Sequence, residues 1–411
     1  MTTDRSTRRA RLALAVASAA IFGLATWRAA GSVEPDYALH AEWAREIAET
    51  GHVSVPHPLF HFLTVLVHAL LPSRLAALVR PGPDAAPADP SFLLAAMVVG
   101  TGAWVALALL VYRRLRAAEG GGESPVTAGG RGPWPAAALT LALMLLGPIT
   151  VLTWARHQLY LGYITPVVFH NPTVALVKPL ALAWFWSVAR ARPGGKNWLV
   201  AALLTVAATL AKPSFTVAFL PALAVWRVLA WRSERAVDVR AAVASLVTGG
   251  VVVAVQAWLR RGSGDASLLV IAPLEVMGFY SPRWEMPFLF VLSVAFPLAA
   301  AFALRSLARR DGPLQLAWLT FAVAAGYGYV LAEADPNTGS GNWLWSGQVA
   351  LFVLLAETLL FLRGRVEQAS PWARRLVWLA FGLQLACGLL WYTAEVVQPH
   401  EWWFPFPEGT D

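Results

Sequence analysis

The chain alternates between long apolar stretches and short polar segments. Most of the apolar stretches run for about 17–24 residues, the length that an α-helix needs to cross roughly 30 Å of hydrocarbon. Lipid offers no hydrogen-bond partners, so the backbone of such stretches is expected to be helical. The pattern predicts an all-α polytopic membrane protein with about eleven spans, near residues 12–31, 91–112, 134–153, 173–190, 198–211, 214–231, 241–259, 286–305, 314–333, 344–362 and 376–395.

One further apolar stretch, residues 58–72, is short for a crossing. Arginines cluster at residues 5–11 and again at 113–116, and positive charge marks the cytoplasmic side of a membrane protein. If the first span runs outward, only one crossing fits between these clusters, and residues 91–112 suit it better. The sequence therefore predicts a single integral membrane domain over 1–411 with a cytoplasmic N-terminus. Residues 32–72 are predicted to form an amphipathic loop with interfacial helices on the outer face.

The composition supports the bilayer as the solvent of this chain. It is 57% hydrophobic and only 14% charged, against about 25% charged in soluble proteins. The net charge of +8 comes mainly from arginines between the apolar stretches, which indicates membrane topology and not nucleic-acid binding. The single cysteine excludes a disulfide framework within the chain. The first apolar stretch resembles a signal peptide without a convincing cleavage site, so we interpret it as an uncleaved span.

The first outer loop contains the most suggestive carboxylate. Pro35 and Gly51 bracket a plausible short helix, and Asp36 and His40 are four residues apart, hence on one helical face. Alanines on another face would let the helix lie flat on the membrane. Asp36 is then either a general base or acceptor-binding carboxylate beside the lipid, or simply the N-cap of that helix.

Histidines follow this helix at helical spacing. His57, His61 and His68 share one stripe, so a divalent metal site is one interpretation, because histidines four residues apart can chelate. Interfacial histidines that face water or pack against neighbours are the simpler interpretation. A polar or phosphate-contacting role is the third, and we favour it over metal for His57.

Basic and polar residues also gather where outer loops enter predicted spans. Arg156 lies in the second outer loop, and His170 and Asn171 precede a Pro-Thr pair that suits a helix start. Lys178 lies inside the following span, where an ionisable group is costly and therefore indicates function, unless it snorkels to the headgroups.

Lys212 and Arg283 extend this set of cations. The chain has only three lysines, and both Lys178 and Lys212 precede a proline at the outer edge of a predicted span. A compact ammonium group suits a phosphate oxygen. Arg283 lies in the long fourth outer loop, from which it can reach an anion.

No nucleotide phosphate loop, dinucleotide fingerprint or protease motif is present. No spans are interrupted in matching halves, which argues against an inverted-repeat transporter.

The order of motifs resembles a known superfamily. An N-terminal span is followed by an outer loop with an early Asp36-Tyr37, then Gly51, then the segment 56–59 (Pro-His-Pro-Leu), then a span ending in two arginines at 113 and 114. This order, over roughly residues 10–115, is similar to that of GT-C membrane glycosyltransferases. These include protein O-mannosyltransferases, aminoarabinose transferases and oligosaccharyltransferases.

The resemblance implies an inverting transfer of sugar from a polyprenyl-phosphate donor to a lipid, glycan or protein acceptor. The reaction would take place at the outer face of a bacterial cytoplasmic membrane, among membrane lipids. Asp36 would activate the acceptor, with Glu34 or Glu42 as a second carboxylate, and His57 would lie near the carrier phosphate. The single proline after His57 departs from the family's His-Pro-Pro-Leu-like run. Substrate contacts are expected from His40, His57, Arg156, His170, Asn171, Lys178, Lys212 and Arg283; no metal ligand is assigned.

Two other functional classes fit the same architecture. A flippase or carrier of lipid-linked saccharides would tolerate loss of Asp36 but would fail when residues lining a path across the bilayer are changed. A polysaccharide polymerase or ligase would yield large saccharide products, whereas a simple transferase moves single sugars.

Overall fold

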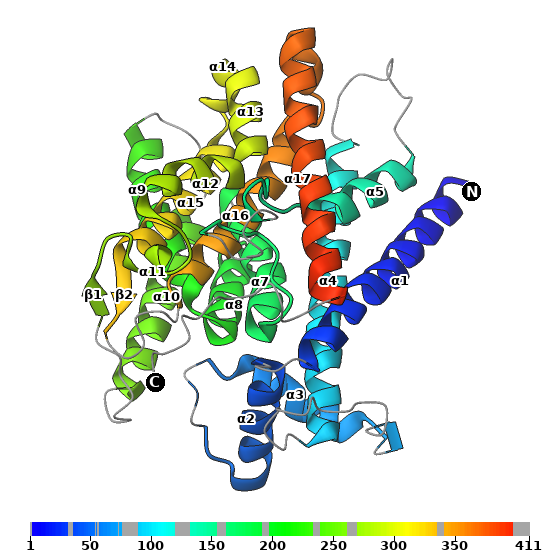
Figure 1. Ribbon diagram of the computed structural model, residues 1–411, viewed down its shortest axis with the longest axis vertical. Helices are drawn as coiled ribbons and strands as arrows, with labels where there is room; N and C mark the ends of the chain where they lie inside the picture. Colours follow the sequence, from blue (N-terminus) through cyan, green and yellow to red (C-terminus); the bar gives the residue numbers. More distant parts are fainter. Residues whose placement is uncertain are drawn as a thin grey trace.

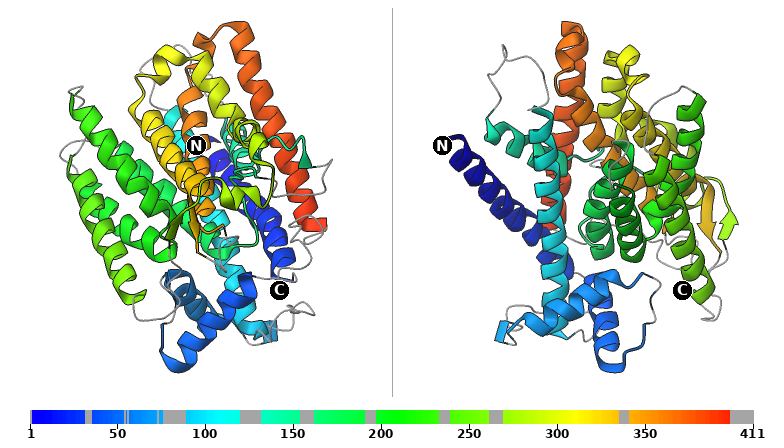
Figure 2. Two further views of the ribbon diagram at one scale, coloured as in Figure 1. Left: turned by 60° about the vertical axis from the view of Figure 1, so that its left-hand side comes forward. Right: turned by 180° about the vertical axis from the view of Figure 1, so that it is seen from behind.

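The computed structural model describes most of the chain. The described residues are 2–31, 36–53, 55, 57–72, 74–75, 89–119, 132–153, 162–190, 197–232, 239–260, 269–334 and 341–397. Within them the protein is a bundle of helices with a small layer of two helices, α2 (Asp36–Thr50) and α3 (Leu59–Leu70), packed across one end (Figures 1 and 2).

Among the described residues, six helices are long and apolar enough to cross a membrane, so the protein is a helical multi-pass membrane protein. They are α1 (Thr2–Ala30), α4 (Pro90–Glu119), α7 (Pro172–Ala189), α10 (Val239–Arg260), α16 (Leu344–Leu362) and α17 (Pro371–Val397). The prediction of an all-α membrane protein is confirmed at this level.

The predicted number of eleven spans is not confirmed, although every predicted span contains a helix. Some of these helices are short: α8 (Asn197–Ala211) has 15 residues and α5 (Pro133–Met144) has 12, which correspond to roughly 22 and 18 Å. The pair α12 (Met286–Ser293) and α13 (Ala295–Ala303) is bent by 61°, and counting it as one span raises the total to seven.

The remaining elements complete the bundle and its loops. Two longer helices are α9 (Ser214–Arg232) and α15 (Gly312–Val330), and the short ones are α11 (Glu275–Gly278), α14 (Arg305–Ala308), η3 (Arg283–Glu285) and η5 (Val366–Gln368). Strands β1 (Leu269–Ile271) and β2 (Leu331–Glu333) pair antiparallel, with Val270 opposite Ala332.

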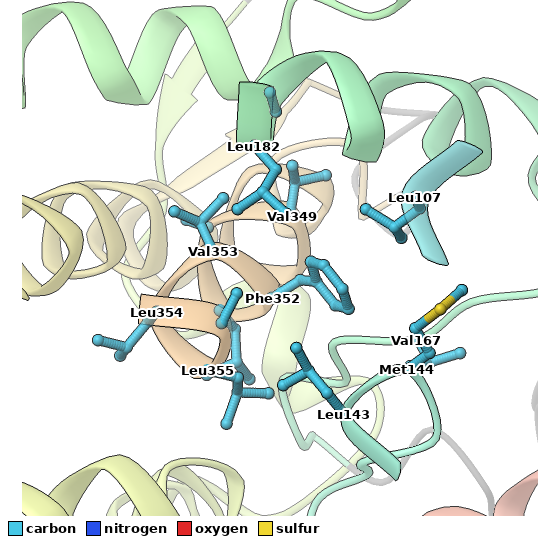
Figure 3. Packing of buried hydrophobic residues seen from close by; sticks show 14 of the residues in the cluster. Leu107, Leu143, Met144, Val167, Leu182, Val349, Phe352, Val353, Leu354 and Leu355 are labelled. Carbon is cyan, nitrogen blue, oxygen red and sulfur yellow. The ribbon is translucent and has the colours of Figure 1, made fainter. Parts of the chain in front are cut away.

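Helix α16 forms the centre of the bundle. All of its residues from Ser346 to Leu362 are buried, and it packs against α7, α9, α13 and α15. Figure 3 shows its apolar side chains meeting those of α4, α5 and α7. Since α16 is hydrophobic on every side, burial inside the bundle is the arrangement expected for it.

Two chain breaks inside the bundle meet at one glutamine of α17. The Gln384 amide nitrogen donates to the carbonyl oxygens of Gly147, after α5, and Ser293, at the end of α12, at 3.0 and 2.9 Å. The Gln384 amide oxygen accepts from the backbone nitrogen of Phe296 at 2.9 Å. Non-helical backbone at membrane depth is tolerated only where protein satisfies it. Gln384 forms the hydrogen bonds that the free backbone groups at both breaks require.

Candidate functional site

The polar cluster begins at Asp36, the first residue of α2. The next residue, Tyr37, is fully buried and anchors the start of α2 in the bundle. Its hydroxyl occupies the space beside Gly100 of α4, where any β-carbon would overlap it. The Asp-Tyr pair thus combines a partly exposed carboxylate with an apolar anchor that fixes its position.

Asn171 connects this carboxylate to the start of α7. Its amide oxygen caps α7 by accepting from the Val174 backbone at 3.0 Å and from the Thr173 hydroxyl at 2.8 Å. Its amide nitrogen donates to Asp36 Oδ2 at 2.8 Å, across 135 positions of sequence. Asn171 therefore connects the start of α7 directly to the carboxylate at the start of α2.

Lys212 lies at the other end of this hydrogen-bonded chain. It occupies the turn between α8 and α9, is only 8% exposed, and donates to the Thr173 hydroxyl at 3.1 Å. Its ammonium group also lies over the ring of Trp345, 5.2 Å from the centroid. Burial lowers the pKa of Lys212 to about 8, and the charge of Asp36 opposes this shift. Lys212 therefore remains mainly a cation at neutral pH.

The three hydrogen bonds between Lys212 and Asp36 all run in the same direction from donor to acceptor. Lys212 donates to Thr173, Thr173 donates to Asn171, and Asn171 donates to Asp36. Hydrogen bonds aligned in series polarise one another, which strengthens the final bond to the carboxylate. The network therefore fixes the orientation of the Asp36 carboxylate.

The histidines of the α2–α3 layer lie beside the network. His40 Nδ1 and His61 Nε2 are 2.8 Å apart and share a hydrogen bond, and the ring of His57 lies 6.4 Å from each of theirs. Burial is the main cause that lowers the pKa of His40 well below its usual value, with His61, His57 and Lys212 adding to the effect. Burial lowers the pKa of His61 to about 4. Both buried imidazoles are therefore neutral at physiological pH.

His170 and Lys178 continue the polar cluster into the bundle. Burial, Lys212 and Lys178 lower the pKa of His170 to about 3, and its ring meets that of Trp345 at 5.7 Å. Lys178 is fully buried over the Trp104 ring of α4, with 4.7 Å between Nζ and the centroid. Its ammonium group has no hydrogen-bond partner among the described residues. Lys178 does not snorkel to the surface, and an anionic group would complete its coordination.

Arg283 does not join the cluster. It pairs with Glu275 at 3.0 Å and lines a separate pocket of about 340 Å³ with Phe279 and Ser281. Of the two candidates for a second carboxylate, Glu42 forms an ion pair with Arg45 on its own helix. Arg156 and Glu34 lie outside the described residues.

The histidine stripe does not form a metal site in the described part of the chain, where no group of three or more histidine, cysteine or acidic side chains is arranged around a common point. His68 diverges from the other two members: it bonds to Ser91 at 3.0 Å and stacks on Phe92. His61 instead pairs with His40.

Sequence reasoning missed the residues that link the cluster. The pattern places His61 in a histidine stripe that either binds metal or packs at the interface, and Thr173 near a helix start. Neither the contact of His61 with His40 nor that of Thr173 with Lys212 was predicted. Trp104 and Trp345 carried no signal beyond belonging to apolar stretches. A tryptophan one helix away from a lone lysine is visible in sequence only once the helix pairing is known.

Comparison with known proteins adds no family assignment. No protein-family model matches the sequence, and a search of curated proteins finds no match. The fold and the cluster therefore define the class: a helical multi-pass membrane protein with a carboxylate, two buried ammonium groups and neutral imidazoles at one end of its bundle.

Proposed function

We propose that this protein is an inverting membrane glycosyltransferase that moves a sugar from a polyprenyl-phosphate carrier to an acceptor hydroxyl. The proposed setting is the outer face of the bacterial cytoplasmic membrane, with the N-terminus in the cytoplasm. The single observation that carries the proposal is the hydrogen-bonded chain from the Lys212 ammonium to the Asp36 carboxylate.

In the proposed reaction, the two ends of this series of hydrogen bonds, Asp36 and Lys212, have different roles. The carboxylate of Asp36 takes the proton of the acceptor hydroxyl as its oxygen attacks the anomeric carbon of the sugar. The bond between that carbon and the carrier phosphate breaks, and the phosphate leaves with the electron pair. Lys212 and Lys178 stabilise the departing phosphate charge, and the imidazole of His57 contacts its oxygens.

Burial explains why a lipid-linked anion is the fitting ligand. Lys178 and Lys212 are held away from water, where an ammonium group is costly unless an anion approaches it. Aromatic rings of Trp104 and Trp345 offset part of this cost. A phosphate carried on a lipid tail can enter such a site from the bilayer, and it supplies several acceptor oxygens at once.

The test uses purified protein in lipid nanodiscs and a panel of polyprenyl-phosphate sugars, with loss of sugar from each carrier as the readout. The variant Asp36→Asn keeps a possible helix cap but removes the base, and we expect at least a 100-fold loss of transfer, in the range of about 10²–10⁴ that general bases contribute. Glu49→Gln is the matched control, because Glu49 is an exposed carboxylate on the same helix and pairs with Arg45.

Three results would contradict the proposal. The first is no sugar transfer from any carrier by folded wild-type protein. The second is unchanged transfer by Asp36→Asn. The third is an equal loss in the Glu49→Gln control, because the effect would then not be specific to the proposed base.

A carrier of lipid-linked saccharides is the second candidate, and one observation favours it. Two interrupted apolar segments meet at Gln384, and interrupted helices are a feature of many transporters. Vesicles containing a fluorescent lipid-linked sugar distinguish the two functions. A carrier moves the lipid between leaflets and tolerates Asp36→Asn, whereas a transferase leaves the leaflet distribution unchanged and loses activity. A polymerase or ligase would yield large saccharide products.

A further inference from the structure

A groove lies on the bundle surface between α8 and α10, away from the polar cluster. It is open to the surface, has a volume of about 600 Å³ and is almost entirely apolar. Trp198 and Ala202 of α8 form one wall, and residues of α10 between positions 239 and 248, among them Arg240, Ala244 and Val247, form the other.

The opposite face of α10 is packed, so the groove is on its outer side. Ser245 accepts a hydrogen bond from the Trp184 indole of α7 at 2.9 Å. Gly249 lies against Leu220, with no room for a β-carbon. The valines of the groove, such as Val247 at 61% exposure, point away from the bundle. In a membrane-spanning helix, such a face meets lipid.

The length of the groove matches one leaflet of a bilayer. Its residues on α10 run from position 239 to 248, the first two and a half turns of the helix, which is roughly 14 Å at 1.5 Å per residue. Half of a bilayer's hydrocarbon thickness is about 15 Å. The groove therefore spans the depth of the acyl chains in the leaflet where α8 and α10 begin.

The polar end of the groove carries a cation and an aromatic ring. Arg240 is the second residue of α10, and Trp198 is the second residue of α8. Tryptophan is enriched at the membrane interface, where headgroups meet hydrocarbon. An arginine at that level attracts an anionic headgroup and forms hydrogen bonds with a phosphate.

We infer that this groove binds one two-chain phospholipid with an anionic headgroup. The acyl chains lie along Ala202, Ala244 and Val247, and the headgroup phosphate accepts hydrogen bonds from Arg240. The small side chains of the two alanines form the floor of the groove and leave room for the chains. The inference does not depend on the proposed glycosyl transfer.

Native mass spectrometry of the purified full chain tests this inference. The protein is transferred from nanodiscs of dioleoyl phosphatidylglycerol and phosphatidylethanolamine in equal amounts, and the retained lipid is counted by mass. We expect one phosphatidylglycerol per chain, preferred about five-fold, the factor that one basic residue near a membrane surface provides. Arg240→Gln should remove the preference, and Ala244→Leu should reduce the retention of both lipids.

Arg113→Gln is the matched control, because Arg113 is an exposed arginine near the end of α4, outside the groove. It should retain phosphatidylglycerol as the wild type does. The inference is overturned if Arg240→Gln keeps the full preference, or if retention does not depend on headgroup charge. A dimer mass in place of lipid adducts would also overturn it, since a second copy would then cover the groove.

Discussion

The glutamine that bridges the two chain breaks offers a sharp test of the fold. Replacing Gln384 by Met keeps a flexible side chain of similar length but removes three hydrogen bonds, to Gly147, Ser293 and Phe296. Helix-to-helix hydrogen bonds in membranes are worth about 0.6–1.7 kcal/mol each. The variant should therefore lose about 2–5 kcal/mol, because the freed backbone groups belong to buried residues of the bundle.

This loss should appear as a lower midpoint of thermal unfolding. From the entropy of unfolding per residue, a chain of this size should show a fall in Tm on the order of 2–6 °C. Cys387 is the only cysteine and lies on the same helix as Gln384, so a maleimide dye that fluoresces on reaction reports unfolding at this place. Leu383→Met is the control, since Leu383 is 44% exposed on the bundle surface and should leave Tm unchanged.

The reasoning fails if Gln384→Met unfolds at the wild-type temperature. It also fails if Leu383→Met lowers Tm as much, because the loss would then reflect any change in α17. Gln384→Glu separates the loss of the hydrogen-bond donor from the loss of the whole polar side chain. An ionised Glu still accepts from Phe296 but cannot donate to Gly147 or Ser293.

Three other predictions concern close packing and charge. Gly388→Ala should lower Tm, because its β-carbon would overlap a backbone carbonyl of the segment after α5, whereas Gly382→Ala has no atom within 4 Å and should not. Asn171→Asp keeps the helix cap but places a second carboxylate against Asp36, so the pKa of Asp36 should rise and the pH–rate profile of transfer should move to higher pH. The pKa of Lys212 is lowered to about 8, so it is a cation below that pH and loses its charge above it. Equilibrium binding of a short polyprenyl phosphate should therefore weaken as pH rises through about 8. Lys212→Arg should abolish this pH dependence. If the dependence is unaltered in Lys212→Arg, another group is responsible for it.

The positions of the helices were largely predictable from the sequence. The apolar stretches begin near helix starts in the structure. The segment 170–173 was predicted to start a helix and does precede α7, but its N-cap is Asn171 and not Thr173, the predicted cap. The extent of α2, Asp36–Thr50, agrees with the short helix predicted between Pro35 and Gly51, because such boundaries depend on residues that are neighbours in the chain. The short stretch at 58–72 does form α3 in the layer at the end of the bundle, and not a long helix of its own.

The interruptions in the bundle were not predictable. The sequence showed no matched breaks, yet α5 ends early and α12 is bent against α13. Both breaks depend on Gln384, a single polar residue in an apolar stretch more than 80 positions away from either. A distant side chain that satisfies freed backbone groups leaves no local pattern.

The sequence by itself determined where the chain is apolar enough for lipid, where most helices begin, and which ionisable residues are out of place in such surroundings. Only the tertiary structure decided which of those residues meet: it joined Asp36 to Asn171 and Lys212, placed Lys178 on Trp104, and left Arg283 apart with Glu275. The physical reason is that helix formation depends on residues a few positions apart. Contact between helices depends instead on packing of side chains from segments that the sequence separates widely.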